Sequence, residues 1–230
     1  MQYVWRIMPQ CSRIPPAALA LLLILAGCGD GRELHEETDA LGYTTHWGTD
    51  PESGLKEGAE TVTGPRGATH SEATYRAGQL HGLRRLYHPN GRLAVEEHYA
   101  GGEFDGPYAT FDSLGHPELS GQYVGGQMSK AWTRYYPDGT VREVVTFADN
   151  QENGPFREWY PDGRPKASGA YLEGDDEHGT LHLYAESGGL ERVLDCDRGR
   201  CQTVWTPDST AAAPPGPDMT APAPVGNESD

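Results

Sequence analysis

Apolar and polar residues alternate in short runs along most of the chain, and turn sequences separate the runs. After Pro89-Asn90-Gly91, for example, apolar side chains recur at Leu93 and Val95. A two-residue period is typical of strands that bury one face. Proline presets φ, and Asn-Gly or Asp-Gly supplies the positive φ that a tight turn requires. The pattern predicts antiparallel strands joined by short turns.

The alternation is organised in a repeat of about 24 residues. Pairs of glycines nine residues apart begin at residues 58, 82, 106, 154 and 179, and Lys130 to Gly139 fills the same frame. One aromatic marker keeps the same spacing, at Tyr75, Tyr99, Tyr123, Phe147 and Tyr171. A lone hairpin is marginal in water, so each unit must stack on its neighbours. We expect an all-β, elongated array of about six β-hairpin units over residues 54–205, including a C-terminal cap.

Further aromatic residues lie two and five positions after the leading residue of several units. They are Tyr108 and Phe111, Trp132 and Tyr135, and Phe156 and Trp159. We interpret them as a ladder of core side chains along one face of the sheet. A groove that binds a ligand through aromatic rings is the alternative.

Two segments carry a resemblance to a known family. Residues 129–139 (SKAWTRYYPDG) and 153–163 (NGPFREWYPDG) look like units of bacterial MORN-repeat-variant proteins, some of which are labelled antitoxin components. The resemblance covers residues 54–205 and is strongest from Gly78 to Gly174. The sequence departs from it at Lys130, where glycine is expected, and over Gly58 to Gly67, where the aromatics are missing. The resemblance implies a repeat fold that serves as a scaffold or binding surface, and no single function.

Residues 1–27 have the order of charge and apolar character of a secretory signal peptide. They contain Arg6, Arg13 and no acidic residue, followed by an apolar run from Ala17 to Ala26. A membrane span needs roughly 20 apolar residues, about twice this run. The segment is therefore expected to direct export.

The end of this segment, Leu25-Ala26-Gly27-Cys28, resembles the bacterial lipobox. The resemblance implies acylation of Cys28 and a membrane anchor, since each buried methylene contributes about 0.8 kcal/mol. An ordinary signal with a chance cysteine is the alternative. In such lipoproteins an aspartate directly after the cysteine often marks retention in the inner membrane. Here that position is Gly29, so the outer membrane is expected, on either its periplasmic or its surface face. The expected location is the cell envelope.

Charge and composition describe the remaining segments. Without the two arginines of the signal, 16 basic residues (18 minus 2) face 34 acidic residues, a net charge of −18. Binding of nucleic acid is excluded, because phosphate contacts need Lys and Arg. Residues 28–53 are expected to form an acidic linker. Residues 206–230, rich in Ala, Pro and Thr, are expected to be a disordered tail.

Two cysteines remain once Cys11 is removed with the signal and Cys28 is acylated. In an oxidising envelope, Cys196 and Cys201 are expected to form a disulfide that clamps the last edge strand. A metal site or free thiols are the alternatives. Zinc needs about four ligands, and no second pair of cysteines exists.

No set of catalytic residues is recognisable, and neither a metal nor a cofactor is expected. His178 and His182 on one strand would lie about 13 Å apart, too far to share a metal ion. The loop Asp175-Asp176-Glu177 is better explained by solvation than by calcium, because no calcium-binding frame surrounds it.

We therefore expect a non-enzymatic, lipid-anchored envelope protein whose repeats bind a protein partner or act as a scaffold. An antitoxin or immunity role is one alternative, since acidic charge suits a basic toxin. An unrecognised hydrolase is another. The residues expected to contact a partner are Arg84, Trp132, Arg134, Arg157 and Trp159.

Overall fold

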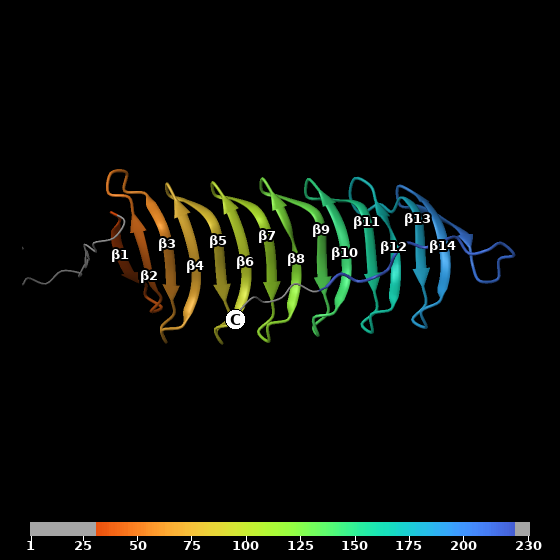
Figure 1. The fold of residues 1–230 in the computed structure, drawn as a ribbon, viewed down its shortest axis with the longest axis horizontal. Helices are drawn as coiled ribbons and strands as arrows, with labels where there is room; N and C mark the ends of the chain where they lie inside the picture. Colours follow the sequence, from red (N-terminus) through yellow and green to blue (C-terminus); the bar gives the residue numbers. More distant parts are fainter. Residues whose placement is uncertain (1–30, 224–230) are drawn as a thin grey trace, which may run out of the picture.

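The structure is a computed structural model that describes residues 31–223. These residues form a single sheet of 15 strands, each paired antiparallel with its neighbours in the chain, and they contain no helix (Figure 1). The elongated all-β hairpin array predicted from the sequence is thereby confirmed.

The strands follow one another in chain order from one end of the array to the other. Their bounds are β1 (Glu33–Thr38), β2 (Thr44–Thr49), β3 (Lys56–Thr63), β4 (Thr69–Arg76), β5 (Gln79–Tyr87), β6 (Leu93–Ala100), β7 (Glu103–Phe111), β8 (Pro117–Val124), β9 (Gln127–Tyr135), β10 (Val141–Ala148), β11 (Gln151–Trp159), β12 (Pro165–Tyr171), β13 (Gly179–Tyr184), β14 (Leu190–Asp197) and β15 (Arg200–Trp205).

Two kinds of turn alternate along the array. Turns such as His88–Gly91 close through a hydrogen bond from the Gly91 amide to the His88 carbonyl, 2.8 Å long. The other turns have two central residues, both with positive φ, as in Gly101 (60°) and Gly102 (88°). This pair of dihedrals is what a type I′ hairpin requires and explains why glycine recurs there.

Hydrogen bonds also join turns and strands of successive units. The Gly102 amide donates to the Leu80 carbonyl at 2.9 Å, and corresponding bonds repeat along the array. At the opposite ends of the strands, next to the Pro-Asp-Gly turns, the Tyr136 hydroxyl donates to the Trp159 carbonyl at 2.8 Å. The tyrosine that precedes each Pro-Asp-Gly turn thus fastens its own unit to the next one.

One face of the sheet, here called the ladder face, carries the aromatic markers. Tyr99 stacks on Phe104 with ring centroids 4.6 Å apart, and Phe104 stacks on Tyr123 at 4.8 Å. Trp132 continues the row and lies over Gly121, where a Cβ atom would approach its ring to 2.2 Å. Glycine is required in that strand because the indole occupies the space above it.

The opposite face is called the tail face and carries Phe111, Tyr135 and Trp159. Residues three apart on a strand point to opposite sides, because side chains alternate with a period of two. Trp132 therefore lies on the ladder face and Tyr135 on the tail face, where its hydroxyl is 2.9 Å from that of Ser120. The prediction of one ladder on one face is corrected to two rows on two faces.

The segment expected to be an acidic linker, residues 28–53, contains strands β1 and β2 of the sheet. Trp47 stacks on His35 with centroids 5.3 Å apart, and Thr49 pairs with Lys56 of β3. The acidic residues of β1 lie on the exposed edge strand, where charge opposes unwanted strand pairing. The array thus begins at Glu33 and not at residue 54.

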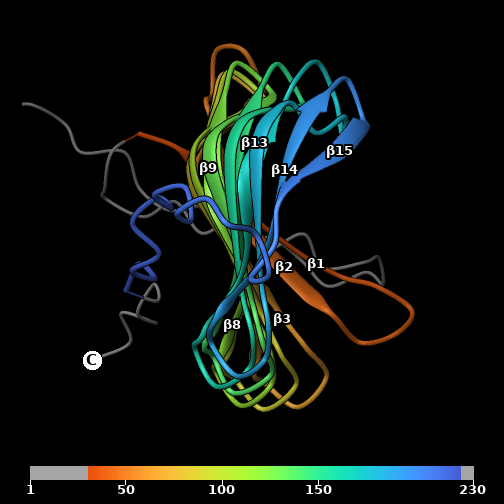
Figure 2. The same ribbon diagram turned by 90° about the vertical axis from the view of Figure 1, so that its right-hand side faces the viewer.

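The C-terminal segment also differs from expectation. Residues 206–223, called the tail, form no strand, yet they turn back from β15 and run along one face of the sheet (Figure 2). Met219 packs against a buried cluster of Tyr135, Val141, Val144 and Trp159. Tertiary contacts therefore fix a segment whose composition alone predicts disorder; residues 224–230 lie outside the described residues.

Candidate protein-binding face

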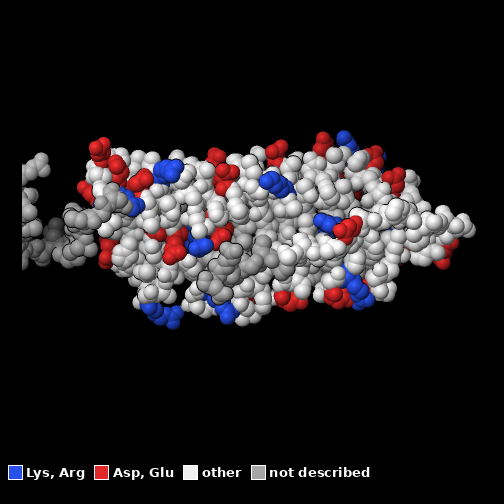
Figure 3. Space-filling model, in the orientation of Figure 1, with Lys and Arg blue, Asp and Glu red and all other residues white. Residues whose placement is uncertain are grey.

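The tail divides the tail face into two halves. The tail lies over the sheet from Tyr135, at the end of β9, to β15, and we call this the covered half (Figure 1). The described tail does not cross the sheet from β3 to β8 or over the first part of β9 around Lys130, and we call this the open half (Figure 1). Acidic and basic side chains adjoin on this face over β4 to β6 (Figure 3).

A groove of about 650 Å³ runs across the open half as far as β9. It is lined by apolar side chains, among them Leu93 and Phe111, and by the polar side chains of Arg85, Glu96 and Lys130. A smaller hollow of about 240 Å³ over β3 to β5 shares Arg85 with it. Apolar walls with a few placed polar groups are the usual composition of a binding site.

The charged residues of the groove hold one another in place. The Arg85 Nε donates to the Glu96 carboxylate at 3.0 Å, and this bond raises the pKa of the guanidinium. The Tyr87 hydroxyl donates to the Glu72 carboxylate at 2.7 Å. Desolvation, with Glu72 as the second cause, raises the pKa of Tyr87 to about 12, so the phenol stays neutral. The pairs Arg85–Glu96 and Tyr87–Glu72 therefore present hydrogen-bond donors and acceptors in fixed orientations on the rigid sheet.

Lys130 stands in this groove with an unusual backbone. Its φ is 61°, at a place in the repeat where Gly82, Gly106 and Gly154 also have positive φ. An L side chain in the left-handed region costs roughly 1–2 kcal/mol. The Lys130 ammonium donates to Gln122 Oε1 at 2.9 Å, beside the groove. Strain of this kind collects at functional sites, and here it places a positive charge in the groove.

The covered half holds the most deeply buried side chains of the tail face. Trp159 is 1% exposed and Val193 is 0% exposed. The Trp159 indole donates to the Met219 carbonyl at 2.8 Å, and Arg157 donates to the Asp218 carbonyl at 3.1 Å. The tail is thus held through its backbone carbonyl groups as well as through the Met219 side chain.

Two polar side chains are buried in the same half. His182 pairs with Ser168 across β12 and β13, and both are under one-tenth exposed. Desolvation lowers the pKa of His182, while a hydrogen bond to the Pro215 carbonyl acts in the opposite direction. Ser168 Oγ and His182 Nε2 have no hydrogen-bond partner among residues 31–223. Neutral imidazole is therefore favoured under the tail.

The five residues expected to contact a partner fall into different environments. Trp132 and Trp159 are buried and act in packing, on opposite faces of the sheet. Arg157 lies beneath the tail on the covered half. Arg134 is largely exposed on the ladder face, 3.5 Å from Glu143. The structure does not bring the five together on one surface.

Arg84, the fifth of these residues, belongs to a polar network at the N-terminal end of the ladder face. Its guanidinium donates to the Glu97 carboxylate at 2.9 Å, and the Tyr99 hydroxyl donates to the same carboxylate at 3.0 Å. Glu97 is buried, and such a charge is tolerated only when it is paired and hydrogen-bonded. Arg84 therefore neutralises a buried carboxylate.

Sequence reasoning missed Arg85 and the groove. Arg85 follows Arg84 directly, and adjacent residues of a strand point to opposite faces, so a choice between them needs the register. Lys130 is different, because it stands where the repeat has glycine and this departure is visible in the sequence. The residue at that position lines the groove, so the departure was the signal that could have located it.

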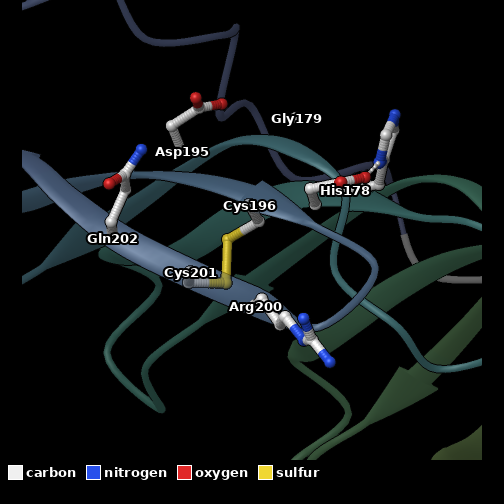
Figure 4. Close-up of a pocket in the computed structure, with 8 residues that line it drawn as sticks. His178, Gly179, Asp195, Cys196, Arg200, Cys201 and Gln202 are labelled. Carbon is white, nitrogen blue, oxygen red and sulfur yellow. Dashed lines mark ion pairs between the residues drawn. A yellow bond between two sulfur atoms is a disulfide. The ribbon is translucent and has the colours of Figure 1, made fainter.

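Cys196 and Cys201 form the disulfide expected from the sequence, joining paired positions of β14 and β15. An open hollow of about 470 Å³ lies beside it, and the side chains of His178, Arg200 and Gln202 surround it (Figure 4). The His178 Nδ1 is 3.5 Å from an Asp197 carboxylate oxygen. Cys196 also packs in the ladder-face core with Phe156 and Leu181, so the disulfide ties the edge hairpin to that core.

Residues 31–223 contain no group of three or more His, Cys, Asp or Glu side chains placed to hold a metal ion. Within the same range, no helix has the length and apolar character needed to cross a membrane. Residues 1–27, expected to be a signal peptide with Leu25, Ala26 and Gly27 in a lipobox, and Cys28, expected to be acylated, lie outside the described residues.

Comparison with known proteins agrees with the geometry. No curated protein sequence matches the chain. The MORN repeat variant family matches at residues 80–100 and 130–149, which correspond to β5–β6 and to β9–β10. These two segments are therefore similar to MORN repeat variants, and the regular hairpin array is consistent with that similarity.

Proposed function

We propose that this chain is a non-enzymatic envelope lipoprotein that binds a protein partner through the open half of its tail face. The observation that carries the proposal is Lys130, which has a positive φ at a glycine position of the repeat and whose side chain lines an amphipathic groove. Repeat arrays of this kind offer an extended surface and not a deep pocket. A segment of a protein fits such a surface better than a small molecule does.

The groove suggests which chemistry the partner offers. Leu93 and Ala109, both partly exposed, provide apolar contact area, and Arg85 and Lys130 provide donors for carboxylates or backbone carbonyls. Glu96, already paired with Arg85, can accept from a basic side chain at the rim. A partner segment with an apolar side chain flanked by polar groups matches this arrangement.

Anchoring at Cys28 forms part of the proposal and rests on the lipobox resemblance. Only residues 29–32 separate Cys28 from the start of β1 at Glu33. An acylated Cys28 would therefore hold the array close to the membrane surface, not on a long tether. Labelling with a radioactive or alkyne-tagged fatty acid tests this point, and Cys28→Ser should abolish incorporation while Cys11→Ser should leave it unchanged.

Site-specific photo-cross-linking in cells tests the binding face. A photoreactive phenylalanine at Gln122 would lie in the groove, whereas the same group at Tyr123 would lie one residue along β8 on the ladder face. We expect a discrete cross-linked protein from position 122, absent from position 123 and weakened by Lys130→Gly. Cross-links of equal strength from both positions, or from 123 alone, would refute the assignment of the face.

An antitoxin or immunity role is the second candidate, favoured by the net charge of −18 derived above for the chain after removal of residues 1–27. Opposite charge accelerates association with a basic partner. The protein cross-linked at position 122 would then be a basic toxin, and deletion of the gene would reduce viability in its presence. A non-toxic envelope protein as the cross-linked species would reject this role and keep the first.

A further inference from the structure

We propose that the covered half of the tail face is a binding site for extended, proline-rich peptide segments, and that the tail of this chain fills the site in cis. The inference goes beyond the proposed function, because it assigns a second binding site on the covered half of the same face. The ligand in trans is a proline-rich segment of a partner protein that resembles the tail in chemistry.

The tail has the chemistry of a polyproline-type ligand. Between Ala211 and Thr220 it reads AAAPPGPDMT, with prolines at 214, 215 and 217. It forms no strand, so it does not extend the sheet by backbone pairing. Proline-rich segments keep an extended conformation with solvated carbonyls and lose little entropy on binding, and aromatic-lined surfaces recognise them.

Donors on the sheet face reach those carbonyls. Trp159 Nε1 donates to Met219 O at 2.8 Å, and Trp205 Nε1 donates to Ala211 O at 3.1 Å. Arg157 adds a bond of 3.1 Å to Asp218 O. Three contacts are made to backbone atoms, which every peptide possesses. The site is therefore suited to many sequences that can adopt the same extended path.

Close approach and one side chain supply the selectivity. At Gly216 a Cβ atom would lie 2.6 Å from the Tyr184 hydroxyl, so any larger residue there requires the Tyr184 side chain to shift, and glycine is favoured in the ligand. Three residues later, Met219 inserts against Tyr135, Val144 and Trp159. The expected ligand contains the sequence proline-glycine-proline, with a large apolar residue three positions after the glycine.

The buried polar atoms of this half also point to a ligand site. His182 contacts the tail at Pro215, and the His182 ring lies 3.8 Å from the Cβ position of Gly216. Ser168 Oγ and His182 Nε2 have no partner within the described part of the chain. A partner segment with a hydroxyl or amide near this position would satisfy groups that the tail leaves unpaired, and so could bind more tightly than the tail itself.

Competition between cis and trans segments sets the expected affinities. A segment tethered by a short linker acts at an effective concentration on the order of millimolar. A free peptide must displace the tail, so its apparent affinity for the intact chain is weakened. Releasing the tail removes this competition without changing the sheet.

The test uses the full chain after signal removal and a fluorescein-labelled peptide with the sequence of residues 207–223. Met219→Asp places a charge in the apolar cluster and should release the tail, whereas Ala212→Asp alters an exposed tail position and serves as the matched control. Fluorescence anisotropy measures binding, and circular dichroism checks that each variant is folded. Met219→Ser gives the same comparison with a milder change.

We expect the M219D chain to bind the peptide at least about tenfold more tightly than the wild type and A212D do. Adding Trp159→Phe to M219D should weaken binding about fivefold to tenfold, because one hydrogen bond is lost. Absence of saturable binding to M219D, equal affinities for M219D and wild type, or indifference to W159F would overturn the proposal. None of these outcomes affects the cross-linking test at position 122, which probes the other half.

Discussion

Tyr87 and Trp159 occupy the same place in their units, three repeats apart, but the chain treats them differently. Both lie on the tail face, five residues after the leading glycine. Tyr87 is partly exposed and bonds the Glu72 carboxylate, whereas Trp159 is almost completely buried and bonds the tail. The repeat therefore fixes the face of the sheet on which a side chain lies. The residue type, and whether the tail covers it, decide whether that side chain packs in the interior or stays accessible to a partner.

Truncation of these two residues should give the largest difference. Trp159→Ala removes a fully buried ring and its bond to Met219, and is expected to lower the free energy of unfolding by about 3–5 kcal/mol. Tyr87→Ala should cost about 1 kcal/mol, because less buried area and one exposed hydrogen bond are lost. Thermal and urea unfolding measure both. Equal losses would show that the covered half is not packed more tightly than the open one.

The disulfide should give the next largest effect at the far end of the covered half. Cys201→Ser opens a loop of about six residues, for which the chain-entropy relation gives about 2 kcal/mol. Hydrogen exchange should show faster exchange of the amides of β14 and β15 than of β5 and β6. Gln202→Ser, one residue along the same strand, is the control and should change exchange little. Unchanged protection in C201S would mean that the hairpin holds without the clamp.

Lys130 offers a smaller effect with the opposite sign. Lys130→Gly relieves a left-handed residue at roughly 1–2 kcal/mol but adds chain entropy of roughly 0.5–1 kcal/mol, so a net gain of about 0.5–1 kcal/mol in stability is expected. Ala131→Gly, at the next position and without positive φ, should instead lose stability. Partner cross-linking at position 122 should fall in K130G despite its higher stability. A stable variant with undiminished cross-linking would remove Lys130 from the site.

Much of this architecture could be predicted from the sequence. The 24-residue spacing of Tyr99, Tyr123 and their counterparts gives the length of the unit, and the two glycine-rich turns in each period give two strands per unit. The two faces could have been separated as well, since Trp132 and Tyr135 are three residues apart. The assignment of both to one face overlooked the two-residue period of a strand.

Other parts lay beyond pattern reasoning. Strands β1 and β2 lack the paired glycines and the aromatic marker, so nothing in Thr44–Thr49 shows membership of the array. The tail docks through carbonyl groups and one methionine, and neither leaves a periodic signal. The groove depends on Arg85 and Lys130 from strands β5 and β9, which only the register brings to the same face.

A pH effect of His182 on stability should be the smallest. The pKa of His182 is lowered from its ordinary 6.5 by desolvation, so the folded chain binds fewer protons at this site than the unfolded chain. The stability that the buried site contributes is therefore fully present above pH 6.5 and falls as the pH drops through the lowered pKa. Urea unfolding measured against pH follows the effect, and His182→Gln should flatten the profile. An identical profile in H182Q would assign the pH dependence to other groups.

The most direct measurement is hydroxyl-radical footprinting of the intact chain, read out by mass spectrometry at Tyr87 and Trp159. We predict fast oxidation of Tyr87 and strong protection of Trp159, with protection lost in Met219→Asp and retained in Ala212→Asp. If Trp159 were oxidised in the wild type as readily as in M219D, the tail would not cover this half of the face, and the division into an open and a covered half would be contradicted.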